Sequence, residues 1–332
     1  MRRRRFVLRA LGCIGAMVAA SGAMAQPYAR PRRVGALIGW NDTGEEAQRS
    51  LATLKERLAA LGWTEGRNLR LDVRWTASDA RKASSFAREL VASNPDAILS
   101  ITTQATAAVQ RETSAIPIVF TAVSDPVGSG FVQTLARPGG NITGFIDMES
   151  SVVSKGLQVL TEIAPQTRRM AVMFNPQTAP FADYYLRAVD TVAEKLRVKV
   201  FAAPVGSEQD IDRVISVLGR EAGSGLMPLP DSFMSLHHKR IIALAAQHKI
   251  PTVYYAAFAV NAGGLIAYGV DYIDLLRRAA TYVDQLLRGA KAADLPVQQP
   301  EKFQLHINLK TARTLGLTVP PSLLLRADGV IE

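Results

Sequence analysis

The sequence predicts an α/β protein made of two doubly wound parallel-sheet lobes in tandem. Two observations predict this fold class. Short apolar strands alternate with amphipathic helices through most of the 332 residues, the pattern of parallel sheets with right-handed crossovers. The alternation occurs twice, once before and once after a glycine-rich segment near Gly144. That glycine-rich strand suggests that the backbone passes there from one part of the fold to the other.

Three strands and three helices are predicted in the first half. The strands cover residues 34–38, 69–73 and 97–101, and the helices cover residues 45–61, 80–92 and 102–111. In the first helix Leu51, Leu54 and Leu58 recur at helical spacing, and Gly62 ends it. The third strand is a continuous apolar run, which is typical of a sheet covered on both faces.

The segment over residues 116–144 is the one around which the chain is organised. It opens as a strand at Ile118, turns at Ser124-Asp125-Pro126, and is expected to form a short helix over residues 131–135. A new strand starts at Ile142. Polar turns at the carboxyl ends of buried parallel strands are where open α/β sheets hold ligands.

The second half repeats the alternation. Its predicted strands cover residues 169–174, 198–202, 225–230, 252–255 and 265–268, and its predicted helices cover residues 153–163, 181–196, 211–219 and 233–248.

The first 25 residues predict a cleaved signal peptide. Arg2–Arg5 form a basic head, an apolar run follows from Leu11, and Ala23-Met24-Ala25 precede the expected cleavage before Gln26. Arg3-Arg4-Arg5 also fits a twin-arginine signal, so the choice between the Sec and twin-arginine routes stays open. The expected location is the periplasm.

Composition excludes several classes of chemistry. Cys13 is the only cysteine and lies in the predicted signal, so the mature chain would have no disulfide or thiolate nucleophile. Five of the 39 basic residues also lie there, which lowers the net charge from +10 to +5 in the mature chain. The remaining charges are mixed in sign, so nucleic-acid binding is not expected. No nucleotide-binding, hydrolase or zinc-protease motif is present, and no cofactor or metal is expected.

Polar residues follow nearly every predicted strand and form the candidate ligand site. Thr102 and Thr103 begin a helix, where free N–H groups favour an anion such as a ligand carboxylate. Asp231 or Asp271 would pair with a ligand ammonium. The alternative is that these residues only cap helices and turns. The candidates are Asn41, Thr102, Thr103, Gln104, Ala105, Ser124, Asp125, Asn175, Asp231, Ser232, Tyr254 and Asp271.

Aromatic residues offer a further contact. Trp40 follows the first strand, and Phe181, Tyr184 and Tyr185 open a helix in the second half. One ring from each lobe would sandwich a flat ligand, while Tyr184 and Tyr185 alternatively cover the sheet.

Several segments resemble the substrate-binding proteins of ABC transporters, in the branch that includes tryptophan and tyrosine binders. The likeness runs from Gly35 to the C-terminus. Its motifs are DPVGSGFVQTLARPGGNITG (125–144), LGWTEGRNL (61–69), PDAILSITTQATAA (95–108), GVDYIDLLRRAA (269–280) and NLKTARTLGLTVP (308–320).

The resemblance implies a type I periplasmic-binding-protein fold with a multi-strand hinge. Lobe 1 would comprise residues 34–144 and 269–299, and lobe 2 residues 145–268 and 300–332. The implied function is capture of a small molecule, such as an amino acid or other small carboxylate, by a monomer that delivers it to an ABC permease. One departure is Asp231-Ser232-Phe233, where many members carry Asp-Asn-Thr, which puts the usual polar contacts there in doubt.

Two other functions stay open. An exported two-lobe sensor would report its ligand to a membrane receptor instead of a permease. An α/β enzyme would need a nucleophile or base with an orienting partner, and no such spacing is visible.

Overall fold

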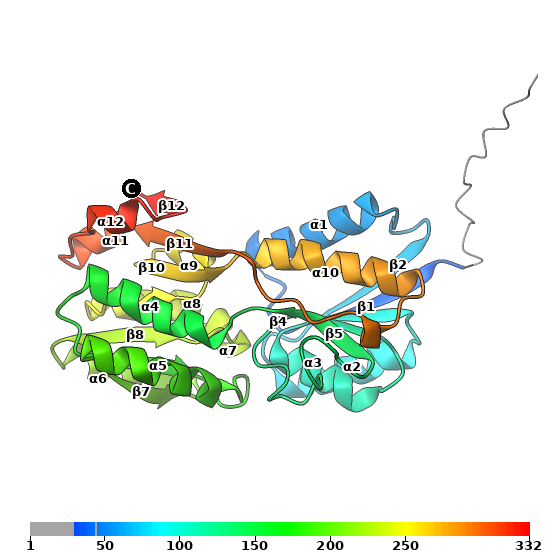
Figure 1. Cartoon of the computed structure of the whole chain (residues 1–332), viewed down its shortest axis with the longest axis horizontal. Coiled ribbons are helices and arrows are strands. Elements are labelled where there is room, and N and C mark those ends of the chain that lie inside the picture. Colours follow the sequence, from blue (N-terminus) through cyan, green and yellow to red (C-terminus); the bar gives the residue numbers. More distant parts are fainter. Residues whose placement is uncertain (1–29, 44) are drawn as a thin grey trace, which may run out of the picture.

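The computed structural model describes residues 30–43 and 45–332, which form two lobes side by side (Figure 1). The predicted export signal at residues 1–25, with Cys13, lies outside the described residues. Within the described part, no helix is both long and apolar enough to span a membrane.

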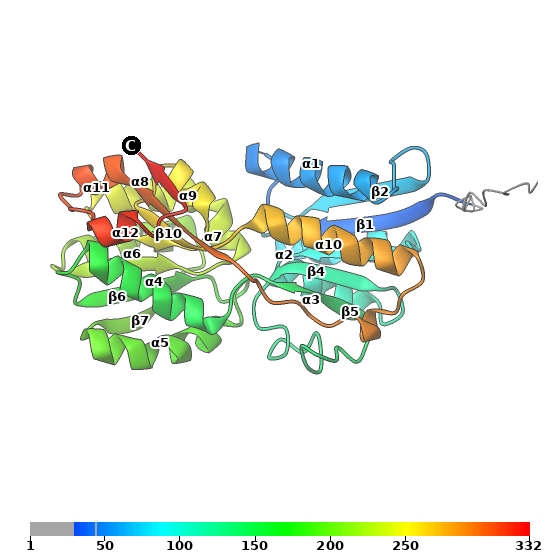
Figure 2. The same cartoon turned by 45° about the horizontal axis from the view of Figure 1, so that its top comes forward.

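Lobe 1 is a five-stranded parallel sheet with strand order β2-β1-β3-β4-β5, covered by helices on both faces (Figure 2). Every residue of β3 and β4 is buried, as their continuous apolar runs predict. The strands are β1 (Arg32–Ile38), β2 (Leu69–Trp75), β3 (Ala97–Ile101), β4 (Ile118–Val123) and β5 (Ile142–Ile146). Helices α1 (Glu45–Ala60) and α10 (Tyr272–Leu287) cover one face, and α2 (Ala80–Ala92) and α3 (Thr103–Glu112) cover the other. A 3-10 turn, η1 (Ala292–Asp294), follows α10.

Lobe 2 has a second sheet in two adjoining parts, β7-β6-β8 and β12-β11-β10-β9, linked by a parallel bridge between Leu226 and Thr252. Strand β11 runs antiparallel to β10, so this sheet is not wholly parallel. The strands are β6 (Arg169–Phe174), β7 (Lys199–Pro204), β8 (Ser224–Pro228), β9 (Val253–Tyr254), β10 (Ile266–Val270), β11 (Phe303–Asn308) and β12 (Gly329–Ile331). The helices are α4 (Ser150–Ile163), α5 (Ala182–Leu196), α6 (Glu208–Gly219), α7 (Ser232–Leu236), α8 (His238–Gln247), α9 (Ala257–Asn261), α11 (Leu309–Thr314) and α12 (Pro321–Leu324).

The chain passes between the lobes after β5, after β10 and before β11 (Figures 1 and 2). A glycine precedes each of the first two crossings, and the backbone requires it. A Cβ on Gly144 would lie 2.1 Å from the Phe120 carbonyl oxygen, and one on Gly269 would lie 1.8 Å from that of Tyr255. Before β11, Gln298 hydrogen-bonds the edge of β5 through Gly144 and Ile146. Close backbone packing therefore fixes where the lobes join.

Two predicted helices are wrong in detail. Residues 131–135 form bends and irregular backbone, because Phe131 and Val132 are buried in the core and the Gln133 N–H bonds to the Pro138 carbonyl. The single helix expected over residues 233–248 is divided at His237 into α7 and α8. Apolar periodicity does not reveal such a break, since both halves keep their buried faces toward the sheet.

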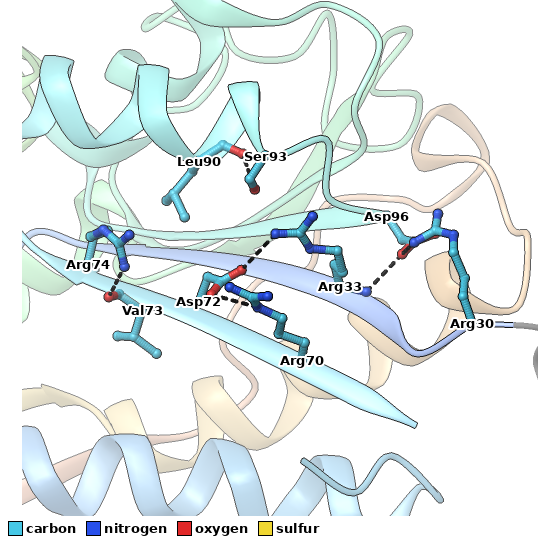
Figure 3. A network of polar contacts seen from close by, with 9 residues as sticks. All are labelled: Arg30, Arg33, Arg70, Asp72, Val73, Arg74, Leu90, Ser93 and Asp96. Atoms are coloured by element: carbon cyan, nitrogen blue, oxygen red, sulfur yellow. Dashed lines mark hydrogen bonds and ion pairs between the residues drawn. The ribbon is translucent and has the colours of Figure 1, made fainter. Parts of the chain in front are cut away.

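The amino-terminal end of the lobe 1 sheet is held by a network of arginines and aspartates (Figure 3). Asp96 accepts hydrogen bonds from the Arg33 backbone at 2.8 Å and from Arg30 and Arg32 at 2.9 Å and 2.7 Å. Asp72 pairs with Arg33 at 3.5 Å. These contacts lie at the end of the sheet opposite the strand ends that face lobe 2.

Candidate functional site

A cleft of about 390 Å³ opens between the lobes. The carboxyl ends of parallel strands share one edge of a sheet, and here the edges of both sheets meet. Lobe 1 supplies one face of α3 and the loop after β4, and lobe 2 supplies the segment before α5. The lining residues are Thr103, Ala107, Gln110, Arg111, Asp125, Gly128, Ser129, Phe131, Pro180 and Phe181.

The corner between β3 and α3 has an unusual backbone. Thr102 has φ 92° and ψ 153°, a conformation that side chains other than glycine rarely adopt. Gly39 makes room for it, because a Cβ there would lie 2.2 Å from Thr102 Oγ1. Thr103 Oγ1 accepts a hydrogen bond from the Ser124 N–H at 3.3 Å, which joins this corner to the end of β4.

The turn after β4 carries a half-buried acid. Asp125 has φ 42°, and its Oδ1 accepts from the Gly128 N–H at 2.8 Å. The other carboxylate oxygen, Oδ2, takes no part in this bond, and Asp125 lines the cleft together with Thr103. A negative charge and a hydroxyl thus lie close together on the lobe 1 wall.

A second strained turn lies beside α3. Ala77 and Ser78 both have positive φ, 49° and 61°. Gln104 Nε2 donates to the Ser78 carbonyl at 3.4 Å. Gln104 Oε1 and Ser78 Oγ are buried and have no hydrogen-bond partner within the described part of the chain. Two polar atoms therefore remain unsatisfied in this turn.

A buried polar network joins the lobes behind the cleft. Tyr185 of α5 donates its hydroxyl to Ser124 Oγ at 2.9 Å, and Ser124 donates to Asp147 Oδ1 at 2.9 Å. Tyr272, at the start of α10, donates to Asp147 Oδ2 at 3.4 Å. Phe181 lies one turn before Tyr185 and packs edge-on against its ring at 5.7 Å. The network thus supports the lobe 2 wall of the cleft.

Burial dominates the electrostatics of this network. It raises the pKa of Asp147 to about 7, against the opposing effect of the hydrogen bonds that the carboxylate accepts. It also raises the pKa values of Tyr185 and Tyr272, helped by the nearby Asp147 charge.

The other flank of the lobe interface is filled by aromatic rings. Trp40 packs edge-on against Tyr272 at 5.9 Å, and Tyr255 packs against Tyr272 at 6.3 Å. Tyr255 also shares a 2.6 Å hydrogen bond with Ser235. On this flank Trp40 therefore already packs against an aromatic ring of the protein itself.

The strand ends of lobe 2 are satisfied internally. Asp231 accepts from the Asn175 N–H, Thr178 Oγ1 and the Met234 N–H at 3.2, 3.0 and 2.8 Å. Burial raises the pKa of Asp231 to about 6, although these bonds oppose it. The carboxylate thus holds two lobe 2 corners together and begins α7.

The structure separates the sequence candidates into five groups. Thr103, Asp125 and Phe181 line the cleft, and Thr102, Gln104, Ala105 and Ser124 lie immediately around it. Trp40 and Asn41 follow β1 toward the aromatic flank. Asn175, Asp231 and Ser232 are buried at the lobe 2 corners, where Ser232 Oγ has no partner among the described residues. Tyr254 and Asp271 serve structural roles.

These last two roles have clear physical reasons. Alternation along β9 directs Tyr254 into the lobe 2 core, while Tyr255 faces Tyr272. Asp271 caps α10, accepting from the Ile273 N–H at 2.9 Å and the Asp274 N–H at 3.2 Å. Neither residue is part of the proposed site.

Sequence reasoning missed Asp147, Tyr255 and Tyr272 altogether, and with them the cleft residues Phe131 and Arg111. One signal was available for Asp147, which is an acid directly after a buried strand where the chain leaves lobe 1. For metals, no group of three or more His, Cys, Asp or Glu side chains with suitable geometry occurs in residues 30–43 and 45–332.

Several known proteins are similar to this chain. A tyrosine-binding protein of Clostridioides difficile (strain R20291) is 26% identical over 256 residues, 77% of this chain and 73% of that protein. A conserved domain protein from Vibrio cholerae O1 biovar El Tor has 29% identity and a TM-score of 0.84, covering 91% of this chain and 100% of that one.

Two further similar structures differ from each other in whether a ligand is bound. A Streptococcus pneumoniae ABC domain in complex with L-Trp has 24% identity and a TM-score of 0.84, covering 91% of this chain and 100% of that one. A Clostridium difficile substrate binding protein in its ligand-free, open form has 25% identity and a TM-score of 0.66, covering 90% and 99%.

These likenesses confirm the predicted two-lobe α/β fold class. The model of the family described as ABC transporter substrate binding protein matches residues 44–331, nearly the whole described chain. The chain therefore belongs to the ABC transporter substrate-binding protein family.

Proposed function

We propose that this protein captures an aromatic amino acid between its lobes in the periplasm and delivers it to an ABC permease. The observation that carries the proposal is the composition of the cleft. Its walls bring together Phe131 from lobe 1 and Phe181 from lobe 2, with Thr103, Asp125 and Arg111 around them. A volume of about 390 Å³ falls within the range of small-molecule sites, roughly 300–1,000 Å³.

The polar groups suit the two charges of an amino acid. Asp125 would take the ammonium, and the hydroxyl of Thr103 with the first N–H groups of α3 would take the carboxylate. The aromatic side chain would then extend toward Phe131 and Phe181. Gln110 and Arg111 lie about two turns further along α3, where they would meet a phenol or indole edge.

Similar proteins support this ligand class, since one is a tyrosine-binding protein and another was crystallised with L-Trp. The TM-score is higher with the L-Trp complex than with the ligand-free open structure, at nearly equal identity and coverage. This favours a closed arrangement of the lobes here, as expected of hinge closure around a ligand. The protein would act as a monomer without catalysis or cofactor, and residues 1–25 would direct its export.

Calorimetric titration of the purified mature protein with L-Trp, L-Tyr, L-Phe and L-Leu tests the proposal. We expect at least one aromatic amino acid to bind, and to stabilise the fold by about 2.7 kcal/mol at a hundredfold excess over Kd. L-Leu should bind more weakly because it cannot stack. Equal binding of L-Leu, or no binding of any of the four, would overturn the ligand class.

Transport needs its own test. Cells that express the protein with its neighbouring permease genes should take up the labelled amino acid, and deletion of the protein should abolish uptake. Binding without protein-dependent uptake would favour the exported sensor instead.

A further inference from the structure

Asp147 is a buried acid at the hinge that the proposed ligand contacts do not use. It follows β5 at the first crossing and is 1% exposed. One oxygen accepts from Ser124 of lobe 1, which in turn accepts from Tyr185 of lobe 2. The other accepts from Tyr272 at the second crossing. The carboxyl group is thus the point where both lobes and two hinge segments meet.

The groups around Asp147 are neutral or acidic. Tyr185 faces it from α5, Tyr272 from α10 and Tyr255 from the end of β9, and Asp125 lies near Tyr185. No Lys, Arg or His of the described chain forms an ion pair with it. An ionised Asp147 would therefore be stabilised only by hydroxyl and backbone donors, and a buried charge without a counter-ion is costly.

We propose that Asp147 is a positioning residue that couples closure of the lobes to uptake of one proton. On closing, the carboxylate takes a proton from solvent and becomes a neutral acid, whose O–H donates to the Tyr272 oxygen. On opening, Tyr185 leaves Ser124, water reaches the carboxyl group and the proton is released. Asp147 acts on the cleft through Ser124 and Tyr185, which supports Phe181. This inference rests on the proposed function only in assigning closure to ligand capture.

The direction of the pH effect follows from the raised pKa of the closed state. Burial holds the pKa of Asp147 near 7 when the lobes are closed, whereas a hydrated aspartate titrates near 4. Closure is then most favourable below about pH 4 and weakens by up to about tenfold per pH unit as pH rises to about 7. Above pH 7 it changes no further, since both states are ionised.

The first test uses the ligand-free protein, so it does not depend on ligand identity. Solution scattering should give a smaller radius of gyration at pH 5 than at pH 8 for the parent. Asp147→Asn, which stays neutral, should give the same radius at both pH values. A parent radius independent of pH, or a variant that follows the parent, would overturn the proposal.

The second test counts protons by titrating L-Trp or L-Tyr at pH 6 in buffers of different ionisation enthalpy. The parent should take up close to one proton on binding, and Asp147→Asn none. Asp231→Asn is the matched control, because that acid is also buried with a raised pKa but has all its partners in lobe 2. It should keep the parental uptake.

Should Asp147→Asn fail to fold, Tyr185→Phe replaces it. Loss of the bond between lobes should move the pH of compaction downward, and an unchanged transition would refute the coupling. Failure of both amino acids to bind would count against the proposed function alone, because the scattering test would still decide the role of Asp147.

Discussion

The two lobes present different backbones to the cleft. In lobe 1, non-glycine residues with positive φ gather at the strand ends: Ala77, Ser78, Thr102, Ala122 and Asp125. In lobe 2, the described residues of this kind are Arg197 and Lys249, which only end helices α5 and α8. Strained backbone persists where the surroundings over-determine it, and it often marks functional sites. Lobe 1 thus presents strained polar corners to the cleft, whereas lobe 2 presents Phe181 from unstrained backbone just before α5.

The largest expected effect concerns the acid of lobe 1. Asp125→Asn removes the charge but keeps an oxygen for the Gly128 N–H. Affinity for the aromatic amino acid should fall by more than tenfold, because loss of a buried charge partner costs about 2–5 kcal/mol. Calorimetry gives the value.

Two other aspartates serve as controls for this substitution. Asp271→Asn keeps its helix-capping oxygen, and Asp190→Asn changes an exposed residue of α5, so both should bind like the parent. If Asp271→Asn loses affinity while Asp125→Asn does not, the ammonium site belongs at the hinge instead.

A smaller effect is expected on the lobe 2 side. Phe181→Leu keeps apolar bulk and removes the ring, so it should cost about 0.5–1.5 kcal/mol of binding free energy. The loss should appear for L-Trp and be absent for L-Leu in parallel titrations. An equal loss for both would mean that Phe181 acts through packing of α5 and makes no ring contact.

The strain itself can be tested at Thr102. Thr102→Gly relieves the φ of 92° and should raise the free energy of unfolding by about 1 kcal/mol, while affinity falls a few fold because α3 is less firmly oriented. Denaturant unfolding and calorimetry measure the two effects. Asn94→Gly, at an exposed positive φ away from the cleft, should change neither by much. A Thr102→Gly protein less stable than the parent would show that the corner stores no strain.

The smallest effect belongs to the far end of lobe 1. Burial acts to raise the pKa of Asp96, but the Arg33 N–H, Arg32 and Arg30 outweigh it and leave the pKa lowered. The stability it provides is present above the unfolded pKa near 4 and is lost as pH falls through the folded value. Asp96→Asn should lower Tm slightly at pH 7, and the difference should vanish at pH 2. A difference that persists at pH 2 would point to packing.

Sequence patterns captured the fold better than the site. Alternation of strands and helices predicted β1–β10 and the helices from α1 to α8, with α7 and α8 joined, because burial on both sheet faces leaves continuous apolar runs such as those of β3 and β4. The rule that ligands lie at strand ends placed Thr103 and Asp125 at the cleft, and the expected aromatic contact placed Phe181 there. The roles of Asp147 and Tyr272 could not be predicted, because they depend on the contact at the hinge between segments 125 residues apart. For Asp231 and Asp271 the sequence left binding and capping open, since a polar residue after a strand looks the same whether it caps or binds.

The repeated passage of the chain between lobes bears on the order in which the protein can be made. Helix α10 packs on the lobe 1 sheet, and Gln298 extends its β5 edge, yet both follow all of the first ten strands in synthesis. Strands β11 and β12 complete the lobe 2 sheet later still. During synthesis the β1–β5 sheet therefore lacks α10 until more than a hundred intervening residues have been made. The two halves should therefore reach their native state together and only after the chain is released.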